Sequence, residues 1–128
     1  MVQKTKILSV CAMGANRSKY IANYLRKKGY STRYGGVKDE AINPLEFKHV
    51  EWAEIIVFAR EKHKKDFENK YGKKYYSGKK IYVLEVRDSG KDVPKGLSYL
   101  HELPREEFNK KWTHPNLRKK LKEEGLVE

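Results

Sequence analysis

The chain is 128 residues long, carries a formal net charge of +12 at pH 7, and is 38% hydrophobic and 36% charged. This length favours a single domain over residues 1–128, and the one cysteine excludes an internal disulfide framework and suits a reducing compartment. No apolar run is long enough to span a membrane, and none follows the N-terminus as a leader would, so the sequence predicts a cytoplasmic protein without membrane contact.

A strand-to-helix junction comes first in the chain. The apolar residues of 6–10 predict a strand that ends at Cys11, the only cysteine of the protein. An amphipathic helix is expected over 18–28, and Gly29 follows it in the position where a glycine commonly ends a helix. Junctions of this kind are where α/β folds bind anions.

The five residues between Cys11 and Arg17 can curl so that their backbone N–H groups form an anion-binding nest. Arg17 can hold two oxygens of a tetrahedral oxyanion, and Gly14 can adopt the positive φ that a nest requires. The same positive field stabilises a thiolate at Cys11. The expected phosphate-binding residues are Ala12, Met13, Gly14, Ala15, Asn16, Arg17 and Ser18. The alternative is that Cys11 is a small buried residue of the core.

The remaining elements alternate between strands and helices. In chain order, the sequence predicts a strand over 30–34 that stops at Gly35-Gly36, a helix over 43–52 capped by Asn43, a strand over 55–59, a helix over 61–71, a strand over 81–86, and helices that open at Pro104 and Pro115. His63, which stands among lysines, is expected at the surface. No histidine or cysteine spacing predicts a metal site, and no cofactor is implied.

This alternation predicts an α/β fold with a four-stranded parallel sheet in the flavodoxin-like order 2-1-3-4, helices on both faces and a helical C-terminal third. Ligands bind such sheets at the carboxyl ends of the strands. Cys11 follows the first strand and Asp88 follows the fourth, so both should lie on that edge. Asp88 is therefore the candidate general acid, and Asp92 is the alternative.

The stretch from Cys11 to Ser18 resembles the Cys-x5-Arg-Ser/Thr phosphate loop of the low-molecular-weight protein tyrosine phosphatases, which also follows the first strand. Residues 52–63 resemble the third strand and following helix of a small branch of that superfamily, known as predicted tyrosine phosphatases. The chain departs from the usual family pattern at Gly14 (usually Asn), Asn16 (often Cys), Lys19 (often Pro) and Ser89 (Pro in the Asp-Pro pair).

The resemblance implies a cysteine-dependent phosphatase that hydrolyses phosphate monoesters, phosphotyrosine in proteins above all, through a cysteinyl-phosphate intermediate. Cys11 would be the nucleophile, Arg17 would hold the phosphoryl group, and Asp88 would protonate the leaving oxygen. The partner would be a phosphorylated substrate, no metal would take part, and the protein would be a monomer.

A non-catalytic function is the alternative: a basic module on the same fold that binds phosphate or nucleic acid. The stretch 70–80 interleaves lysines with tyrosines, as proteins that bind single strands do. The same stretch contains two glycines between a predicted helix and a predicted strand. A loop with solvated lysines is the simpler interpretation, so nucleic acid is not the favoured partner.

Overall fold

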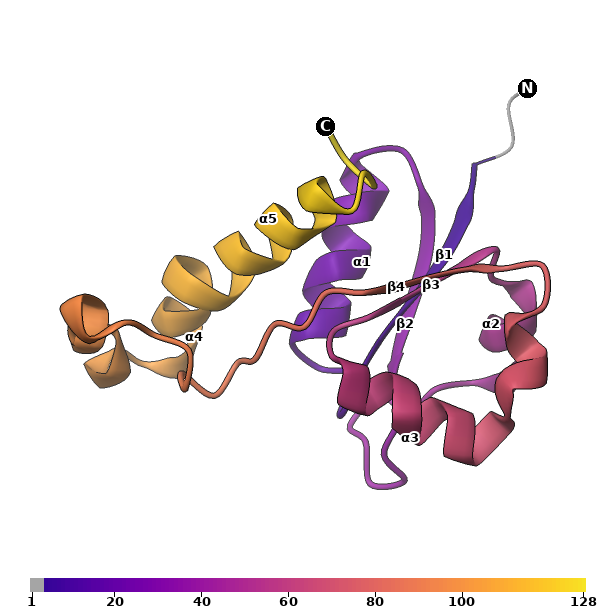
Figure 1. The fold of residues 1–128 in the computed structure, drawn as a ribbon, viewed down its shortest axis with the longest axis horizontal. Helices are drawn as coiled ribbons and strands as arrows, with labels where there is room; N and C mark the ends of the chain where they lie inside the picture. The colour runs from indigo at the N-terminus through magenta and orange to yellow at the C-terminus, as the bar shows by residue number, and fades with distance from the viewer. Residues whose placement is uncertain (1–3) are drawn as a thin grey trace.

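The central element is a parallel sheet of four strands in the order β2-β1-β3-β4 (Figure 1). The structure is a computed structural model that describes residues 4–128. The strands are β1 (Lys6–Cys11), β2 (Ser31–Gly36), β3 (Ile55–Phe58) and β4 (Lys80–Val83). In β1, Cys11 pairs with Gly36 of β2, and Val10 pairs with Phe58 of β3. The predicted fold class and strand order are confirmed.

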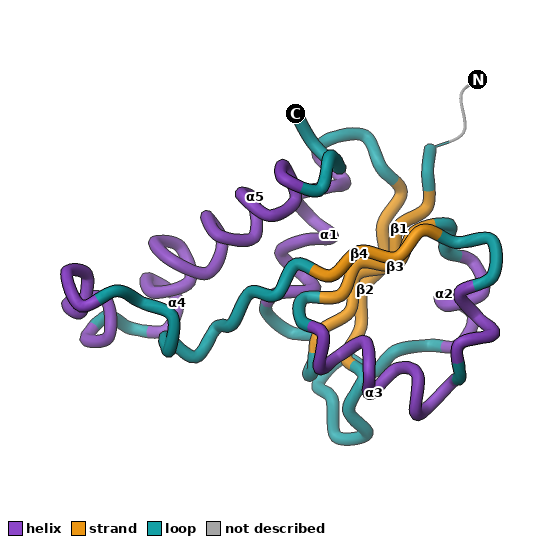
Figure 2. The backbone as a smooth tube through the Cα atoms, in the orientation of Figure 1, coloured by secondary structure: helices purple, strands orange, loops and turns teal. Residues whose placement is uncertain are grey.

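Helices cover both faces of the sheet, as Figure 2 shows. The four that do so are α1 (Arg17–Lys27) and α5 (His114–Glu123) on one face, and α2 (Phe47–Trp52) and α3 (Glu61–Tyr71) on the other. Alternate strand residues enter the two cores, with Ile7 and Val57 in the first and Leu8 and Phe58 in the second. Both faces of the sheet are therefore buried, as a parallel sheet requires.

Two helix ends lie where their glycines predict them. Lys28 caps α1, and Gly29 follows with φ of +104°. Gly72 caps α3 with φ of +87°. Positive φ is accessible to glycine at little cost, and it turns the chain out of the helix so that the last carbonyl groups are satisfied.

The prediction that Gly35 and Gly36 stop the second strand is wrong, because β2 includes both residues. A Cβ atom on Gly35 would lie 2.9 Å from the Cα of Leu45. A Cβ atom on Gly36 would lie 2.4 Å from the backbone carbon of Met13. The glycines therefore allow two neighbouring segments to approach the strand closely.

The predicted helix start at Asn43 is also wrong, since α2 begins only at Phe47. Pro44 instead forms an isolated parallel bridge with Gly36. The N–H of Gly36 donates to the carbonyl oxygen of Asn43 at 2.8 Å. The Asn-Pro pair continues the sheet edge beside the loop that follows β1, rather than opening a helix.

The fourth strand is shorter than predicted and ends at Val83. Glu85 has φ of +53°, which interrupts the strand. The chain still runs beside β3, because the N–H groups of Leu84 and Val86 donate to the carbonyl oxygens of Phe58 and Ala59, each at 2.9 Å.

The C-terminal third is helical, as predicted, and it is reached by a long loop after β4 (Figure 2). Its elements are the 3-10 helix η2 (Lys95–Glu102), α4 (Arg105–Phe108), the π-helical turn η3 (Asn109–Thr113) and α5, and a second 3-10 helix, η1 (Lys73–Tyr76), follows α3. Within residues 4–128, none of the helices has the length and apolar content needed to cross a membrane.

Candidate active site

The loop between β1 and α1 is fastened to the segment that follows β2. Carbonyl oxygens of Cys11, Ala12 and Met13 accept backbone hydrogen bonds of 2.9–3.1 Å from residues 37–43. These hydrogen bonds engage the loop's carbonyl groups on that side and hold the loop beside the end of β2.

Gly14 has φ of +71°, as the sequence predicts. A Cβ atom here would lie 2.3 Å from the carbonyl oxygen of Asn43 and 2.6 Å from the nitrogen of Gly36. Both are backbone atoms that cannot move away cheaply. Only glycine therefore fits this position, on conformational and on steric grounds.

The Cys11 thiol is free and buried, and it lies within the loop. Its Sγ accepts a hydrogen bond from the N–H of Gly14 at 3.3 Å. The Oγ of Ser18 lies 3.1 Å from Sγ, at hydrogen-bonding distance, and its hydroxyl can donate once the sulfur is a thiolate. These contacts distinguish Cys11 from a cysteine that only fills space in the core.

Arg17 is the first residue of α1 and is 7% exposed. Its Nη1 donates to the carbonyl oxygen of Val86 at 2.9 Å. Its Nε lies 3.4 Å from Oδ2 of Asp88, which is ion-pair distance. The N–H group does not point at that oxygen closely enough for a hydrogen bond, so the buried Nε–H has no acceptor. A buried, unsatisfied guanidinium N–H beside the loop is available to an oxyanion.

Of the two candidate acids, the structure brings Asp88 to the loop. Besides the pairing with Arg17, its Oδ2 accepts a hydrogen bond of 3.1 Å from Nδ2 of Asn16. Asp92 instead lies 4.0 Å from the guanidinium of Arg87, and its side chain is largely solvated.

Three residues at the site come from the C-terminal third and were not foreseen. Asn109 and His114 both contact Asn16, at 3.3 and 3.4 Å, and Arg105 donates to the backbone carbonyl of Asp88. Their sequence surroundings carry no motif, and no periodicity of the chain places them next to Cys11. Only the tertiary fold brings them there.

The prediction that His63 lies at the surface is wrong, because it is 2% exposed. Burial, together with the nearby Arg17, Arg60 and Lys62, lowers the pKa of His63 from 6.5 to about 3. Its Nδ1 is buried and has no hydrogen-bond partner. One signal could have found it: His63 lies four residues before Phe67, the apolar residue that faces the core on the same side of α3.

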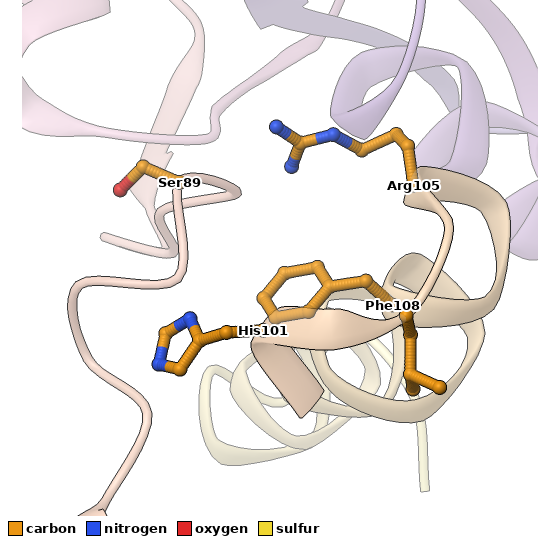
Figure 3. A pocket seen from close by; sticks show the side chains of 5 residues that line it. Ser89, His101, Arg105 and Phe108 are labelled. Atoms are coloured by element: carbon orange, nitrogen blue, oxygen red, sulfur yellow. The ribbon is translucent and has the colours of Figure 1, made fainter. Parts of the chain in front are cut away.

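A hollow of about 280 Å³ adjoins the Asp88 segment (Figure 3). It is lined by Ser89, His101, Leu103, Arg105 and Phe108. Figure 3 shows the guanidinium of Arg105 extending across the hollow toward the Ser89 segment. The buried ring of Phe108 lies beneath that guanidinium, 5.8 Å from centroid to Cζ. Arg105 therefore supports the loop that carries Asp88.

The tyrosines of 70–80 are not displayed as a stacking platform. Tyr71 and Tyr76 pack against Phe67 in the second core, with ring centroids 4.9 and 5.5 Å from it. Tyr75 lies edge-on to Phe47. No cluster of three or more metal-binding side chains occurs among residues 4–128.

The sequence matches no family model and no curated protein, but the structure is similar to solved phosphatase structures. Wzb of Vibrio vulnificus in complex with benzylphosphonate aligns with a TM-score of 0.64 at 14% identity, over 94% of this chain and 96% of that chain. A low-molecular-weight protein tyrosine phosphatase of T. tengcongensis aligns with a TM-score of 0.60 at 16% identity, over 94% and 99%.

The YwlE arginine phosphatase from Geobacillus stearothermophilus aligns with a TM-score of 0.58 at 17% identity, over 91% of this chain and 85% of that chain. The chain therefore has the fold of the low-molecular-weight protein tyrosine phosphatases, over nearly its whole length.

Proposed function

We propose that this protein is a cysteine-dependent phosphate monoester hydrolase of the protein tyrosine phosphatase type. One arrangement carries the proposal: Cys11 Sγ lies within an anion-binding loop, and the Nε–H of the buried Arg17 beside it has no acceptor. A phosphoryl group seated in the loop would accept that N–H and would present its phosphorus to the sulfur.

In the first step, the Cys11 thiolate attacks phosphorus opposite the ester oxygen. An S–P bond forms and the P–O bond to the leaving group breaks, while the Asp88 carboxyl proton passes to the leaving oxygen. Loop N–H groups and Arg17 stabilise the charge on the equatorial oxygens. The products are an alcohol or phenol and a cysteinyl-phosphate.

In the second step, water attacks the cysteinyl-phosphate. The Asp88 carboxylate takes a proton from that water, an O–P bond forms, and the S–P bond breaks. Inorganic phosphate leaves, and the Cys11 thiolate and the Asp88 carboxyl proton are restored. The proposed chemistry requires no metal. Because the Cys11 thiol must stay reduced to act as the nucleophile, we place the protein in the cytoplasm. We also expect the protein to act as a monomer.

Phosphotyrosine is the substrate class that we favour, because the fold neighbours include tyrosine phosphatases. YwlE is an arginine phosphatase, so phosphoarginine belongs in the same substrate panel. The competing function is a module that binds phosphate and does not turn it over.

The deciding experiment compares the wild-type protein with Cys11→Ser on p-nitrophenyl phosphate, with vanadate binding measured on both. We expect the variant to lose hydrolysis and to keep vanadate binding, because backbone N–H groups and Arg17 remain. Hydrolysis at near wild-type rate in Cys11→Ser would refute the phosphatase. If the wild-type protein bound vanadate but turned over neither p-nitrophenyl phosphate nor phosphotyrosine nor phosphoarginine, it would be a binding module.

A further inference from the structure

The side-chain amide of Asn16 engages both of its N–H donors and its oxygen. Nδ2 donates one hydrogen to Oδ2 of Asp88 at 3.1 Å and the other to Oδ1 of Asn109 at 3.3 Å. Oδ1 lies 3.4 Å from Nε2 of His114. Since an amide oxygen only accepts, His114 must be the donor, in the tautomer that carries its proton on Nε2.

The Asp88 carboxylate sets the orientation of the amide, because after rotation by half a turn the amide oxygen would face Oδ2 of Asp88, an acceptor. Burial, with a contribution from Arg118, lowers the pKa of His114, so its ring is neutral near pH 7. The ring is held by stacking on Tyr20, with centroids 3.9 Å apart.

A π-helical turn brings the two C-terminal partners to one side of their helix. The N–H of His114 donates to the carbonyl oxygen of Asn109, five residues earlier, within η3. In a regular α-helix, residues five apart point about 140° away from each other. The wider π turn reduces that angle, so both side chains can reach Asn16, and turns of this kind often occur at functional sites.

We propose that Asn16 is a positioning residue for the general acid Asp88, and that Asn109 and His114 fix the orientation of the Asn16 amide for this role. The proposal rests on the proposed function. Asn16 touches neither the phosphorus nor the leaving oxygen through its side chain. It acts by holding the Asp88 carboxyl group on the side of the loop where a leaving oxygen would lie.

The test compares two substrates whose leaving groups depend differently on protonation by the acid. It measures kcat/KM, because that constant reports the step in which the leaving group departs. Asn16→Ala should lower the ratio of kcat/KM for an alkyl phosphate to that for p-nitrophenyl phosphate about 10-fold, part of the range for lost general acid catalysis. The double variant Asn16→Ala/Asp88→Asn should be no slower on the alkyl phosphate than Asp88→Asn alone, within about 2-fold.

Two further variants probe the same network from α5 and η3. His114→Phe keeps an aromatic ring for Tyr20 and removes only the donor to Asn16, and Asn109→Ala removes the acceptor. Each should shift the substrate ratio at least about 3-fold in the same direction. Asn69→Ala, an exposed asparagine on α3, is the matched control and should leave the ratio as in the wild type. Vanadate affinity of each variant reports whether the loop itself is intact.

The outcomes separate this proposal from the proposed function. Without Cys11-dependent turnover in the wild type, the phosphatase itself is refuted. With turnover present, an unchanged ratio in Asn16→Ala, or an additive loss in the double variant, overturns the positioning role and leaves the phosphatase standing. If Asn16→Ala does not fold, the ratios of His114→Phe and Asn109→Ala decide, and two unchanged ratios overturn the proposal.

Discussion

Arg17 and Asp88 form an ion pair at the carboxyl edge of the sheet, with Nε 3.4 Å from Oδ2. Arg17 is the first residue of α1, whereas Asp88 lies in the loop after β4, so the pair connects the start of α1 to the segment that follows β4. The same guanidinium donates to the carbonyl oxygen of Val86 at 2.9 Å. Arg17 thus donates one N–H to a structural acceptor and keeps its Nε–H without an acceptor. Only a side chain with several N–H groups, such as a guanidinium, can do both.

Replacing Arg17 with lysine keeps the charge and loses the fork. We expect Arg17→Lys to lower kcat/KM about 100-fold, corresponding to about 2.7 kcal/mol of lost transition-state stabilisation. Steady-state kinetics on p-nitrophenyl phosphate give the value, and Arg118→Lys on α5 serves as the matched control. A loss below about 5-fold would show that Arg17 does not hold the phosphoryl group.

The two candidate acids predict different kinetics. Asp88→Asn should lower kcat/KM for an alkyl phosphate about 100-fold or more, because an alkoxide leaves poorly without a proton. The loss should be much smaller for p-nitrophenyl phosphate. Asp92→Asn should change either constant by less than about 3-fold, since Asp92 faces Arg87 and not the loop. The opposite pattern would assign the acid to Asp92.

Gly14 gives a test of the loop that does not depend on the chemistry. In Gly14→Ala the new Cβ would meet backbone oxygen and nitrogen at 2.3 and 2.6 Å, at a φ of +71°. We expect a loss of at least about 2 kcal/mol in the free energy of unfolding, together with weakened vanadate binding. Gly96→Ala, where a Cβ has nothing within 4 Å, is the control and should bind vanadate as the wild type does. Equal vanadate affinity in both variants would contradict the assigned loop conformation.

The sequence predicts best what depends on neighbouring residues. The Cys11–Arg17 spacing, the positive φ of Gly14 and the ends of α1 and α3 are local features, and each is present in the structure. The strand order follows from the alternation of strands and helices, together with the handedness of their connections.

Predictions from neighbouring residues fail where a segment distant in the sequence determines the local structure. Gly35 and Gly36 look like a strand stop, but they remain in β2 because Leu45 and Met13 approach them closely. Asn109 and His114 reach the site only because α5 packs beside α1. No sequence pattern near these residues indicates that α5 packs beside α1, so their position beside Asn16 is visible only in the folded chain.

The last prediction concerns His63 and acid stability. Its pKa is about 3 in the folded protein, against 6.5 for an ordinary histidine, so between these values the unfolded chain binds more protons. The contribution of the neutral His63 to the free energy of unfolding is therefore complete above about pH 6.5. It is lost as the pH falls toward 3, by roughly 1 kcal/mol per pH unit. His63→Leu, of similar volume, cannot take up that proton, so its free energy of unfolding should fall less between pH 6.5 and 4.5 when measured by urea titration. His101→Gln changes an exposed histidine and should follow the wild-type curve. Parallel pH curves for His63→Leu and the wild type would mean that His63 is solvated and titrates normally.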